Sequence, residues 1–512
     1  MKYIKRAAIA MLLALLLMLV FTACAKTETQ DAKNTPQTED GPQSSDDLGD
    51  APNEADTAAK EEEPRIMPDL PDMDFGGFVF KIITTDYISE RIMPQEIWAE
   101  QETGDPINDA IYKRNKKIEE RYNIAITEIL HARDEMNVPV KKSVLAADNA
   151  YDLICTNIKQ GGIMAQRGEL HDLSKVNHID LKKPWYDQNG TADLSVGRKV
   201  YFAVGDLQSS NKDGTWVILF NKKLIQDLGL SDPYTLVNEG RWTMDKMFEY
   251  AASASRDIDG DGKMDETDQW GMLGEGFNIY ALMNGAGTRL VEKDENDIPY
   301  YAGYTARDVD IFEKGAEYLG DKDRSMLAEN YSSKYTNVWN ELINPIFATD
   351  RILFFFTSLS RVTWHRDYGT DFGILPTPKY EEAQANYVNT VSVWMACAYS
   401  AAVTLEGGDL DRSAIVAEAL SAESKYTLIP AYYDIQLKTK LARDNESSQM
   451  LDMIFANRTY SLVQLYDWGG LLSTITQQLT AKNRTFVSSM DKIQNKIAGD
   501  IEKTVNAFDK VN

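Results

Sequence analysis

Five aspartates between residues 257 and 268 have a spacing that suits cation binding. In the segment DIDGDGKMDETD, carboxylates occupy the first, third, fifth, ninth and twelfth positions. The sixth position is a glycine, which permits a sharp turn, and the seventh would offer only a backbone carbonyl. This order is that of an EF-hand-like Ca²⁺ loop, with aspartate replacing the usual final glutamate. The predicted ligands are Asp257, Asp259, Asp261, Lys263, Asp265 and Asp268.

We favour a structural role for this calcium ion. Carboxylates so close together would repel one another without a cation to neutralise them. No neighbouring base indicates chemistry at the ion, and extracellular sites of this kind need only weak affinity. The alternative is a solvated acidic turn that binds nothing.

Patterns that would indicate an enzyme are absent from the sequence. It contains no G-x-S-x-G, no H-E-x-x-H and no phosphate-binding glycine loop, and its four histidines are scattered. Cys155 and Cys397 lie in apolar stretches, which predicts two buried thiols, although a disulfide between them stays open.

The strands and helices that would position a ligand site begin near residue 78. Three β-rich runs, at 78–84, 124–129 and 151–156, are separated by helical patterns. This alternation predicts a parallel sheet with helices on both faces, the α/β class. Ligands bind such sheets at the carboxyl ends of the strands. The alternative is that the residues at these ends are ordinary loop residues or helix caps. The residues predicted there are Thr85, Asp86, Thr156 and Asn157.

The N-terminus has the pattern of a bacterial lipoprotein signal peptide. Lys2, Lys5 and Arg6 precede an apolar run that ends at Phe21 and is short for a membrane span. The next residues complete Phe-Thr-Ala-Cys, which resembles the lipobox, whose cysteine is diacylated after cleavage. This predicts cleavage after residue 23, lipid attachment at Cys24 and a location at the cell membrane, on its extracellular face. The alternative is a plain secretory signal.

Residues 24–67 are predicted to form a disordered acidic tether. Between positions 25 and 64 there are twelve acidic residues against three lysines, and Leu48 is the single large aliphatic residue. Such a segment cannot bury enough apolar surface to offset the entropy of ordering it. We expect it to hold a folded solute-binding part, residues 68–512, away from the membrane.

The composition excludes two classes of partner. Lys and Arg total 54 against 79 Asp and Glu, a formal net charge of −25. Nucleic-acid binding requires clustered basic residues at phosphates, and docking on anionic lipid requires a basic face, so neither is expected. With 512 residues, 43% of them apolar, the chain can form more than one lobe.

Five segments resemble, in order, motifs of the extracellular solute-binding proteins of ABC importers. They are YDLICTNIKQGGIMAQRGELHDLS (151–174), WVILFNKKLIQDLGL (216–230), GRWTMDKMFEYA (240–251), DRILFFFTSLSRV (350–362) and DFGILPTPKYEEAQANYV (371–388). The resemblance is strongest to the family 1-like, sugar-type lipoproteins of Gram-positive bacteria. It implies a two-lobed, periplasmic-binding-protein-like α/β fold with a hinge and an interlobe ligand cleft. Lobe 1 would comprise about 76–213 and 386–430, and lobe 2 about 214–385 and 431–512.

The resemblance also implies ligand contacts. Glu275, Phe277 and Asn278 match the cleft segment of the family. Thr357 and Ser358 match the end of a strand that carries a ligand-stacking residue in many relatives, although no aromatic residue stands there in this sequence.

Aromatic side chains provide further candidates, because sugars stack their C–H faces on aromatic rings. Trp216 enters a strand where the family chain crosses between the lobes, and Trp394 and Trp468 are also candidates. A core position is equally open for each of them. Trp98, Trp242 and Trp339 are expected in the core.

Together these features predict a monomeric, lipid-anchored solute-binding protein that is not an enzyme. It would capture a carbohydrate, expected to be an oligosaccharide, by hinge closure and deliver it to ABC permease subunits. Three alternatives stay open: a secreted glycoside-processing enzyme, a sensor-type protein that reports to a membrane kinase, and a peptide as the ligand.

Overall fold

The computed structural model of the protein describes residues 65–86, 96–365, 370–433 and 445–510. The predicted signal peptide, the lipidation site Cys24 and most of the predicted tether lie outside the described residues. Residues Arg65–Asn512 form one compact unit.

The beginning of this unit includes the last residues of the predicted tether. Arg65 forms an ion pair with Glu423, and the backbone amide of Ile66 donates to the Tyr426 hydroxyl at 2.8 Å. Residues 65 and 66 are therefore attached to the folded part, ahead of its predicted start at residue 68.

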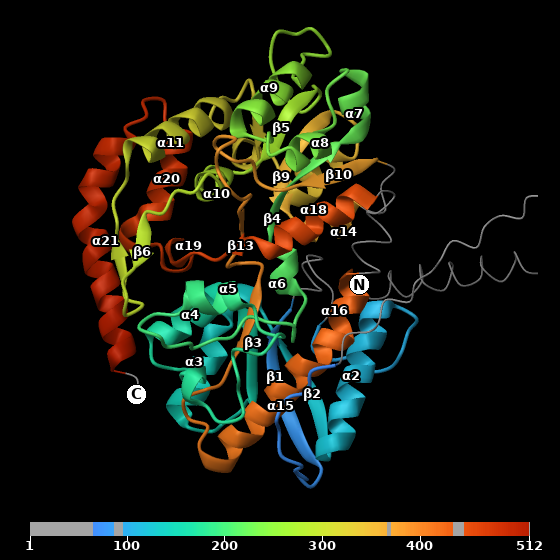
Figure 1. Cartoon of the computed structure of the whole chain (residues 1–512), viewed down its shortest axis with the longest axis vertical. Coiled ribbons are helices and arrows are strands. Elements are labelled where there is room, and N and C mark those ends of the chain that lie inside the picture. Colours follow the sequence, from blue (N-terminus) through green and yellow to red (C-terminus); the bar gives the residue numbers. More distant parts are fainter. Residues whose placement is uncertain (1–64, 87–95, 366–369, 434–444, 511–512) are drawn as a thin grey trace, which may run out of the picture. The chain divides into compact units, whose positions relative to one another are not determined.

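The first lobe is built on a four-stranded sheet with the order β12-β3-β1-β2 (Figure 1). β1 Phe78–Thr85, β2 Ile124–His131 and β3 Leu153–Asn157 are parallel, and β12 Cys397–Ser400 is antiparallel to β3 at the edge. These three parallel strands are the three that the sequence predicts. The helices of this lobe include α2 Pro106–Tyr122, η1 Arg133–Glu135, α3 Asn137–Ala146, α4 Ile158–Gln166, η2 Leu173–Lys175, α5 Gln188–Leu194 and α15 Gly407–Tyr426.

Helix α2 illustrates how local sequence sets these elements. The Asp105 carboxylate caps its first turn by accepting from the amides of Ile107 and Asn108, and Pro106 stands at the first helical position. Asn123 ends the helix in the left-handed conformation. The apolar face predicted from the spacing of four residues is buried, and it consists of Ile107, Ile111, Ile118 and Tyr122.

The second lobe is built on a five-stranded sheet with the order β10-β4-β9-β5-β8. Its strands are β4 Trp216–Asn221, β5 Trp270–Gly274, β8 Ser325–Leu327, β9 Ile352–Ser358 and β10 Phe372–Leu375. β5, β8 and β9 are parallel, whereas β4 runs antiparallel to both β9 and β10. All five strands consist entirely of buried residues, as expected for a sheet that is covered on both faces.

Several helices and a hairpin complete the second lobe. Helix α9 packs on β5 and β9, and α10 packs on α11. The elements are α7 Lys222–Asp227, α8 Pro233–Asn238, α9 Met244–Ala254, α10 Asn278–Gly285, β6 Val291–Lys293, β7 Pro299–Tyr301, α11 Ala306–Leu319, α12 Ala328–Tyr331, η3 Trp339–Ile343, α13 Asn344–Phe347 and α14 Ser360–His365.

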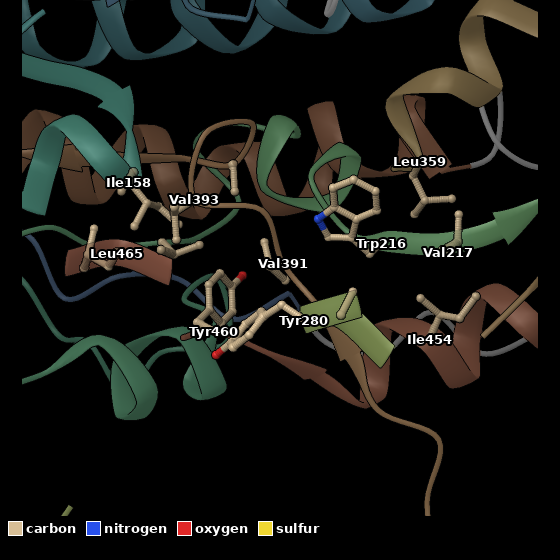
Figure 2. Close-up of a cluster of buried hydrophobic side chains, with 14 of the residues drawn as sticks. Ile158, Trp216, Val217, Tyr280, Leu359, Val391, Val393, Ile454, Tyr460 and Leu465 are labelled. Atoms are coloured by element: carbon tan, nitrogen blue, oxygen red, sulfur yellow. The ribbon is translucent and has the colours of Figure 1, made fainter. Parts of the chain in front are cut away.

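The chain crosses between the lobes more than once, as the resemblance implies. The short helix α6 Ser210–Asp213 leads from the first lobe into β4, and β11 Asn389–Thr390 leads back towards β12. β11 pairs in parallel with β13 Arg458–Thr459, so two separate segments are joined at the junction. Figure 2 shows the apolar cluster that packs there, with Ile158 of the first lobe, Val217 of the second and Val391 of the connecting segment.

The C-terminal helices contact both lobes. Helices α19 and α21 contact α4 of the first lobe, whereas α20 contacts α10 and α11 of the second. The bounds are α16 Leu428–Pro430, α18 Asn445–Ala456, α19 Leu462–Tyr466, η5 Trp468–Gly470, α20 Leu471–Leu479 and α21 Phe486–Asp509. The sequence analysis assigned residues 431–512 to the second lobe alone, and the exact lobe boundaries stay a prediction.

The predicted α/β class is confirmed by these two sheets and their covering helices. Within the described ranges, no helix combines the length and the apolar composition that crossing a membrane requires.

Candidate functional site

A cavity of about 1040 Å³ lies between the two lobes. The first lobe contributes Arg133 from η1 and Lys159 from α4, and the second contributes residues that follow β5, β8 and β9. The connecting segment contributes Ser392, Trp394 and Met395. A ligand in this cavity would therefore touch both lobes and the segment that joins them.

Strand ends supply most of the charged groups in the cavity. Each of these groups lies within three residues of the carboxyl end of a parallel strand: β2, β3, β5, β8 or β9. Sheets of this class present their ligand sites at these ends. The groups, in strand order, are Arg133, Lys159, Glu275, Glu329 and Arg361.

Three aromatic rings form one side of the cavity. The rings of Trp216 and Phe277 lie 5.0 Å apart between centroids, and Phe277 meets Trp394 edge-on at 6.2 Å. Trp216 also contacts Phe356 edge-on, which anchors it to the second sheet. Such a row of rings offers apolar faces to a ligand without allowing the cavity to collapse.

The carboxyl group of Glu275 is held largely in its neutral form. Burial, together with the nearby Glu329, raises its pKa to about 8, although Arg361 acts in the opposite direction. Glu329 is positioned by a hydrogen bond in which its Oε1 accepts from the Gly276 amide at 2.8 Å. Near neutral pH, Glu275 can therefore both donate and accept hydrogen bonds.

Two cations of the cavity are also affected by burial. Burial lowers the pKa of Arg361 to about 10, and it lowers the pKa of Lys159 as well. Lys159 donates through Nζ to the Leu465 carbonyl at 2.5 Å, and its Nζ lies 5.9 Å from the centre of the Trp394 ring. Arg361 stacks above the Trp339 ring at 5.1 Å.

Half of the ligand contacts predicted from the sequence line the cavity. They are Trp216, Glu275, Phe277, Thr357, Ser358 and Trp394. Whether they bind a ligand stays a prediction, but the structure brings them together.

The other predicted contacts lie elsewhere. Asn157 caps α4 by accepting from the Gln160 amide, and Thr156 is buried in β3. Thr85 and Asp86 end β1, next to residues 87–95, which lie outside the described ranges. None of these four residues is among those that line the cavity.

Asn278 and Trp468 are also placed outside the cavity lining, for structural reasons. The Asn278 side chain is buried and accepts from the Glu275 amide at 2.7 Å, so it shapes the turn that presents Glu275. The indole of Trp468 is buried, stacks on Tyr466 at 5.0 Å and donates to the Thr504 hydroxyl.

Trp339, which was expected in the core, packs against it but also lines the cavity. Trp339 is only partly buried; it begins the π-helical segment η3, and its ring supports Arg361. Trp242 is fully buried as expected, donating to the Pro376 carbonyl, and Trp98 packs against the core.

Sequence reasoning missed the charged residues Arg133, Lys159, Glu329, Arg361 and Asp467. The rule of strand carboxyl ends would have found Arg133, Glu329 and Arg361, had it been applied to every strand and not only to the first and third. It would have found Lys159 had it been extended two residues beyond the third strand. Asp467 lies in a turn between α19 and η5, and no sequence signal marks it.

The acidic loop 257–268 has the geometry of a partly formed cation site. Carboxylate oxygens of Asp257, Asp259 and Asp261 lie within 4.8 Å of one another. Gly262 adopts φ +78°, and its amide donates to Asp257 at 2.9 Å, which turns the chain around the carboxylates. The three converging oxygens are hard ligands of the kind that Ca²⁺ prefers, so the residues fit this ion.

The last two predicted ligands of this loop are engaged by the protein itself. Asp268 is buried and accepts from the Ile258 and Asp265 amides, both at 2.8 Å. The Asp265 carboxylate accepts from the Thr267 amide and hydroxyl. No residue of this loop lines the interlobe cavity.

Cys155 and Cys397 are both buried thiols, as the apolar context predicts. They lie on the neighbouring strands β3 and β12, where Cys155 is opposite Tyr399 and Cys397 is opposite Asn157.

The raised pKa of Glu275 predicts a pH dependence of stability. Between about pH 4.5 and 8, the folded state keeps a proton that the unfolded chain has lost, so the free energy of unfolding falls as pH rises. The contribution of one group is up to about 1.4 kcal/mol per pH unit. The Glu275→Gln variant lacks this contribution, so urea unfolding at pH 5, 6.5 and 8 should show its stability rising relative to the native protein.

The matched control for this prediction is Glu313→Gln, on the exposed face of α11. A Glu275→Gln profile that stays parallel to the native profile over the whole range would contradict the prediction.

Solved structures of other proteins share this architecture. No protein-family model and no curated protein matches the chain. The sugar-binding protein MalE from Xanthomonas citri aligns over 84% of this chain and 99% of its own, at 12% identity and a TM-score of 0.57.

Two further structures give similar values. The ABC substrate-binding protein Lmo0181 from Listeria monocytogenes, in complex with cycloalternan, covers 85% of this chain and 98% of its own (12% identity, TM-score 0.52). A cyclo/maltodextrin-binding protein complexed with maltotetraose covers 84% and 96% (13% identity, TM-score 0.51). The chain thus has the two-lobed, periplasmic-binding-protein-like α/β fold of ABC substrate-binding proteins, with its cavity between the lobes.

Proposed function

We propose that this protein captures a carbohydrate, an oligosaccharide, in the interlobe cavity and delivers it to the permease subunits of an ABC importer. The observation that carries the proposal is the cavity of about 1040 Å³, which both lobes line and in which aromatic rings lie beside polar groups. Its size is at the upper end of the range typical of ligand sites. Two solved structures of the same fold hold the sugars cycloalternan and maltotetraose.

The lining suits the two kinds of surface that a sugar presents. Trp216, Phe277 and Trp394 offer ring faces for C–H groups. Thr357 and Ser358 end β9 at the same cavity, and Glu275 near pH 7 can both donate to and accept from a hydroxyl.

Capture would proceed by closure of the lobes. A ligand that touches both lobes binds the closed form more tightly than the open form, so it shifts the population towards closure. We propose that the protein acts as a monomer.

Binding without turnover is part of this proposal. Glu275 and Glu329 share the cavity, and a glycosidase also requires a pair of carboxyl groups. Here Glu329 accepts from the backbone of Gly276, so it has a local role in holding the turn that carries Glu275. We assign both residues to ligand binding and to the shape of the cavity.

The first test is binding of neutral oligosaccharides to the purified full-length protein, measured by thermal shift and calorimetry. At least one sugar should raise the melting temperature. Trp394→Ala should weaken its binding about tenfold through the lost ring face. Tyr300→Ala, which removes an exposed ring outside this cavity, is the control.

Two results would contradict the proposed function. One is stabilisation by peptides with no effect of any sugar. The other is the appearance of hydrolysis products when the protein is incubated with the bound oligosaccharide.

We propose lipid anchoring through Cys24 at the extracellular face of the cell membrane. The lipobox-like sequence before Cys24 and the acidic segment that follows it support this arrangement. Two acyl chains give stable anchoring, whereas one would be marginal. In a Gram-positive host, the native protein should fractionate with membranes, and Cys24→Ser should be released into the medium. An equal distribution of both forms would contradict anchoring at this residue.

We also propose that the loop 257–268 binds Ca²⁺ in a structural role. The convergence of Asp257, Asp259 and Asp261 supports this, since a divalent cation would offset their mutual repulsion. For a weak extracellular site, saturation at about 100 times Kd would stabilise the fold by about 2.7 kcal/mol.

The expected outcome is that about 10 mM Ca²⁺ raises the melting temperature and that a chelator reverses the effect. Asp259→Ala should abolish the Ca²⁺-dependent shift, whatever its effect on stability in the absence of metal. Asp294→Ala, in the turn between β6 and β7, removes an aspartate that also accepts backbone amides but belongs to no cluster, so the shift should remain. A Ca²⁺ effect that survives Asp259→Ala would place the ion elsewhere.

A further inference from the structure

A hairpin of the second lobe contacts the first lobe outside the ligand cavity. The hairpin consists of β6, β7 and the turn 294–298 between them, and it packs along α21 (Figure 1). Its tip contacts the turn 195–198, which follows α5 of the first lobe. The described residues that line the interlobe cavity all belong to other segments.

Asp297, at the tip of the hairpin, makes the central contact. The Gly197 amide donates to its backbone carbonyl and the Arg198 amide donates to its carboxylate, both at 2.8 Å. Two consecutive amides of one turn thus bind the same aspartate, as backbone nests bind anions. The Arg198 guanidinium also donates to the Glu295 carbonyl at 3.0 Å.

Lys293, at the end of β6, adds a second set of contacts. Its Nζ donates to the Ala192 carbonyl at 2.6 Å and to the Ser195 hydroxyl at 3.1 Å, both in the first lobe. The same Nζ lies 2.9 Å from the Asp297 carboxylate, and both side chains are only 19% exposed. Partial burial limits the screening of this ion pair by salt, so the pair holds both residues together against the first lobe.

A second cavity, of about 340 Å³, lies between this contact and the connecting segments. Its lining comes from α5 of the first lobe, from α10 and residues 288–293 of the second, and from the connecting residues 459–463. Tyr280 forms part of its wall towards the interlobe cavity. The Tyr280 hydroxyl is hydrogen-bonded to the Ser461 hydroxyl at 2.5 Å, and its ring contacts Phe277, which lines the interlobe cavity. The two cavities therefore lie on opposite sides of the connecting segments.

The position of the contact determines what happens to it when the lobes close. Rotation about the connecting segments that narrows the interlobe cavity widens the space on their other side. Glu329 and Ser473 line the interlobe cavity and are exposed, so this cavity is open to solvent in the present arrangement. Closure would therefore pull Lys293 and Asp297 away from the turn 195–198.

We propose that the β6–β7 hairpin is an interlobe latch, which holds the unliganded protein open through Lys293 and Asp297. A ligand that closes the lobes must supply the free energy that breaks these contacts. The latch therefore lowers the population of the closed form in the absence of ligand. The inference rests on the proposed function in one respect, which is that the lobes close, and it does not depend on the identity of the ligand.

Two single variants remove the latch contacts. Asp297→Gly removes the carboxylate at a residue with φ +64°, where glycine is unstrained, and Lys293→Met removes the three Nζ donors but keeps an unbranched side chain. The neutral oligosaccharide that gives the largest thermal shift is titrated calorimetrically into the full-length protein. Each variant should bind it about fivefold more tightly, because the apparent Kd falls as the closed fraction rises.

Glu292→Ala is the matched control for these variants. Glu292 belongs to the same hairpin and accepts from the Tyr300 hydroxyl of that hairpin at 2.9 Å, so its removal should leave the affinity unchanged. Lys293→Met carries the test if Asp297→Gly does not fold.

A measurement without ligand separates the latch from the proposed function. Spin labels on cysteines introduced at the exposed residues Val138 of the first lobe and Ser333 of the second report the interlobe distance by pulsed EPR, with Cys24→Ser in every sample. The two native thiols of the folded part are buried, so they should not take up label. Lys293→Met and Asp297→Gly combined should add a component at shorter distance, which the control should lack.

The outcomes distinguish a failure of the latch from a failure of sugar capture. If a sugar binds and the latch variants bind it no more tightly than the native protein does, the latch is overturned and sugar capture stands. If no saccharide binds, the proposed function falls and the interlobe distances decide. A double variant whose distances match those of the control then overturns the latch, whereas a shorter component supports it.

Discussion

The cavity depends on one constraint of parallel β-sheets, which is that the carboxyl ends of their strands all lie at one edge. In this protein, two such edges face a shared space, so charged residues far apart in the sequence meet there. Arg133 and Arg361 are 228 positions apart, and each lies just beyond the end of its strand. In the second sheet, the strands consist entirely of buried residues, which fixes the strand ends of that lobe. The positions of the cavity's charges therefore follow from the packing of the sheets.

At the junction between the lobes, tight side-chain packing surrounds the few chain segments that cross from one lobe to the other. The cluster in Figure 2 contributes apolar packing through Val391, Val393 and Leu465, and the ladder between β11 and β13 joins two connecting segments by backbone bonds. Beside this ladder, Arg458 forms a buried ion pair with Asp187. The Tyr460 hydroxyl donates to the same Asp187 carboxylate at 2.9 Å. A buried pair of this kind tolerates little misalignment, so it defines the path of the segments at the junction. Rotation of the lobes would then be confined to a few backbone positions.

More of the fold than of the cavity could be predicted from the sequence, for a physical reason. Strands β1, β2 and β3 and the buried face of α2 follow from local hydrophobic periodicity, which the sequence displays directly. The likeness of short segments to a family located Trp216, Glu275 and Phe277, and the need for aromatic rings at a sugar site added Trp394. All four are now seen to share one cavity. Charged residues in short turns carry no periodicity, and their proximity arises only from strand register and from the approach of two lobes.

Trp339 and Asn278 illustrate how local context decides a role. Trp339 was expected in the core on a helical pattern; it begins a π-helical segment at the edge of the core, where its ring also lines the cavity and supports a guanidinium. Asn278 was expected to contact ligand, but its side chain holds the turn before α10. In both cases backbone geometry, which the residue type does not reveal, determines what the side chain can reach.

The strongly negative charge of the chain is unevenly distributed, and little of it acts inside the cavity. Of the formal net charge of −25, the segment 25–64 alone carries −9, from three lysines and twelve acidic residues. Exposed charges are screened over about 8 Å at physiological ionic strength, so most of the surface has little influence inside the cleft. Within the cavity, where low polarisability strengthens each interaction, the lining carries both signs of charge: Arg133, Lys159 and Arg361 lie there with Glu329 and Asp467. The surface charge of the chain would thus act mainly on the rate of encounter with a ligand, whereas the groups that line the cavity would set how long it stays.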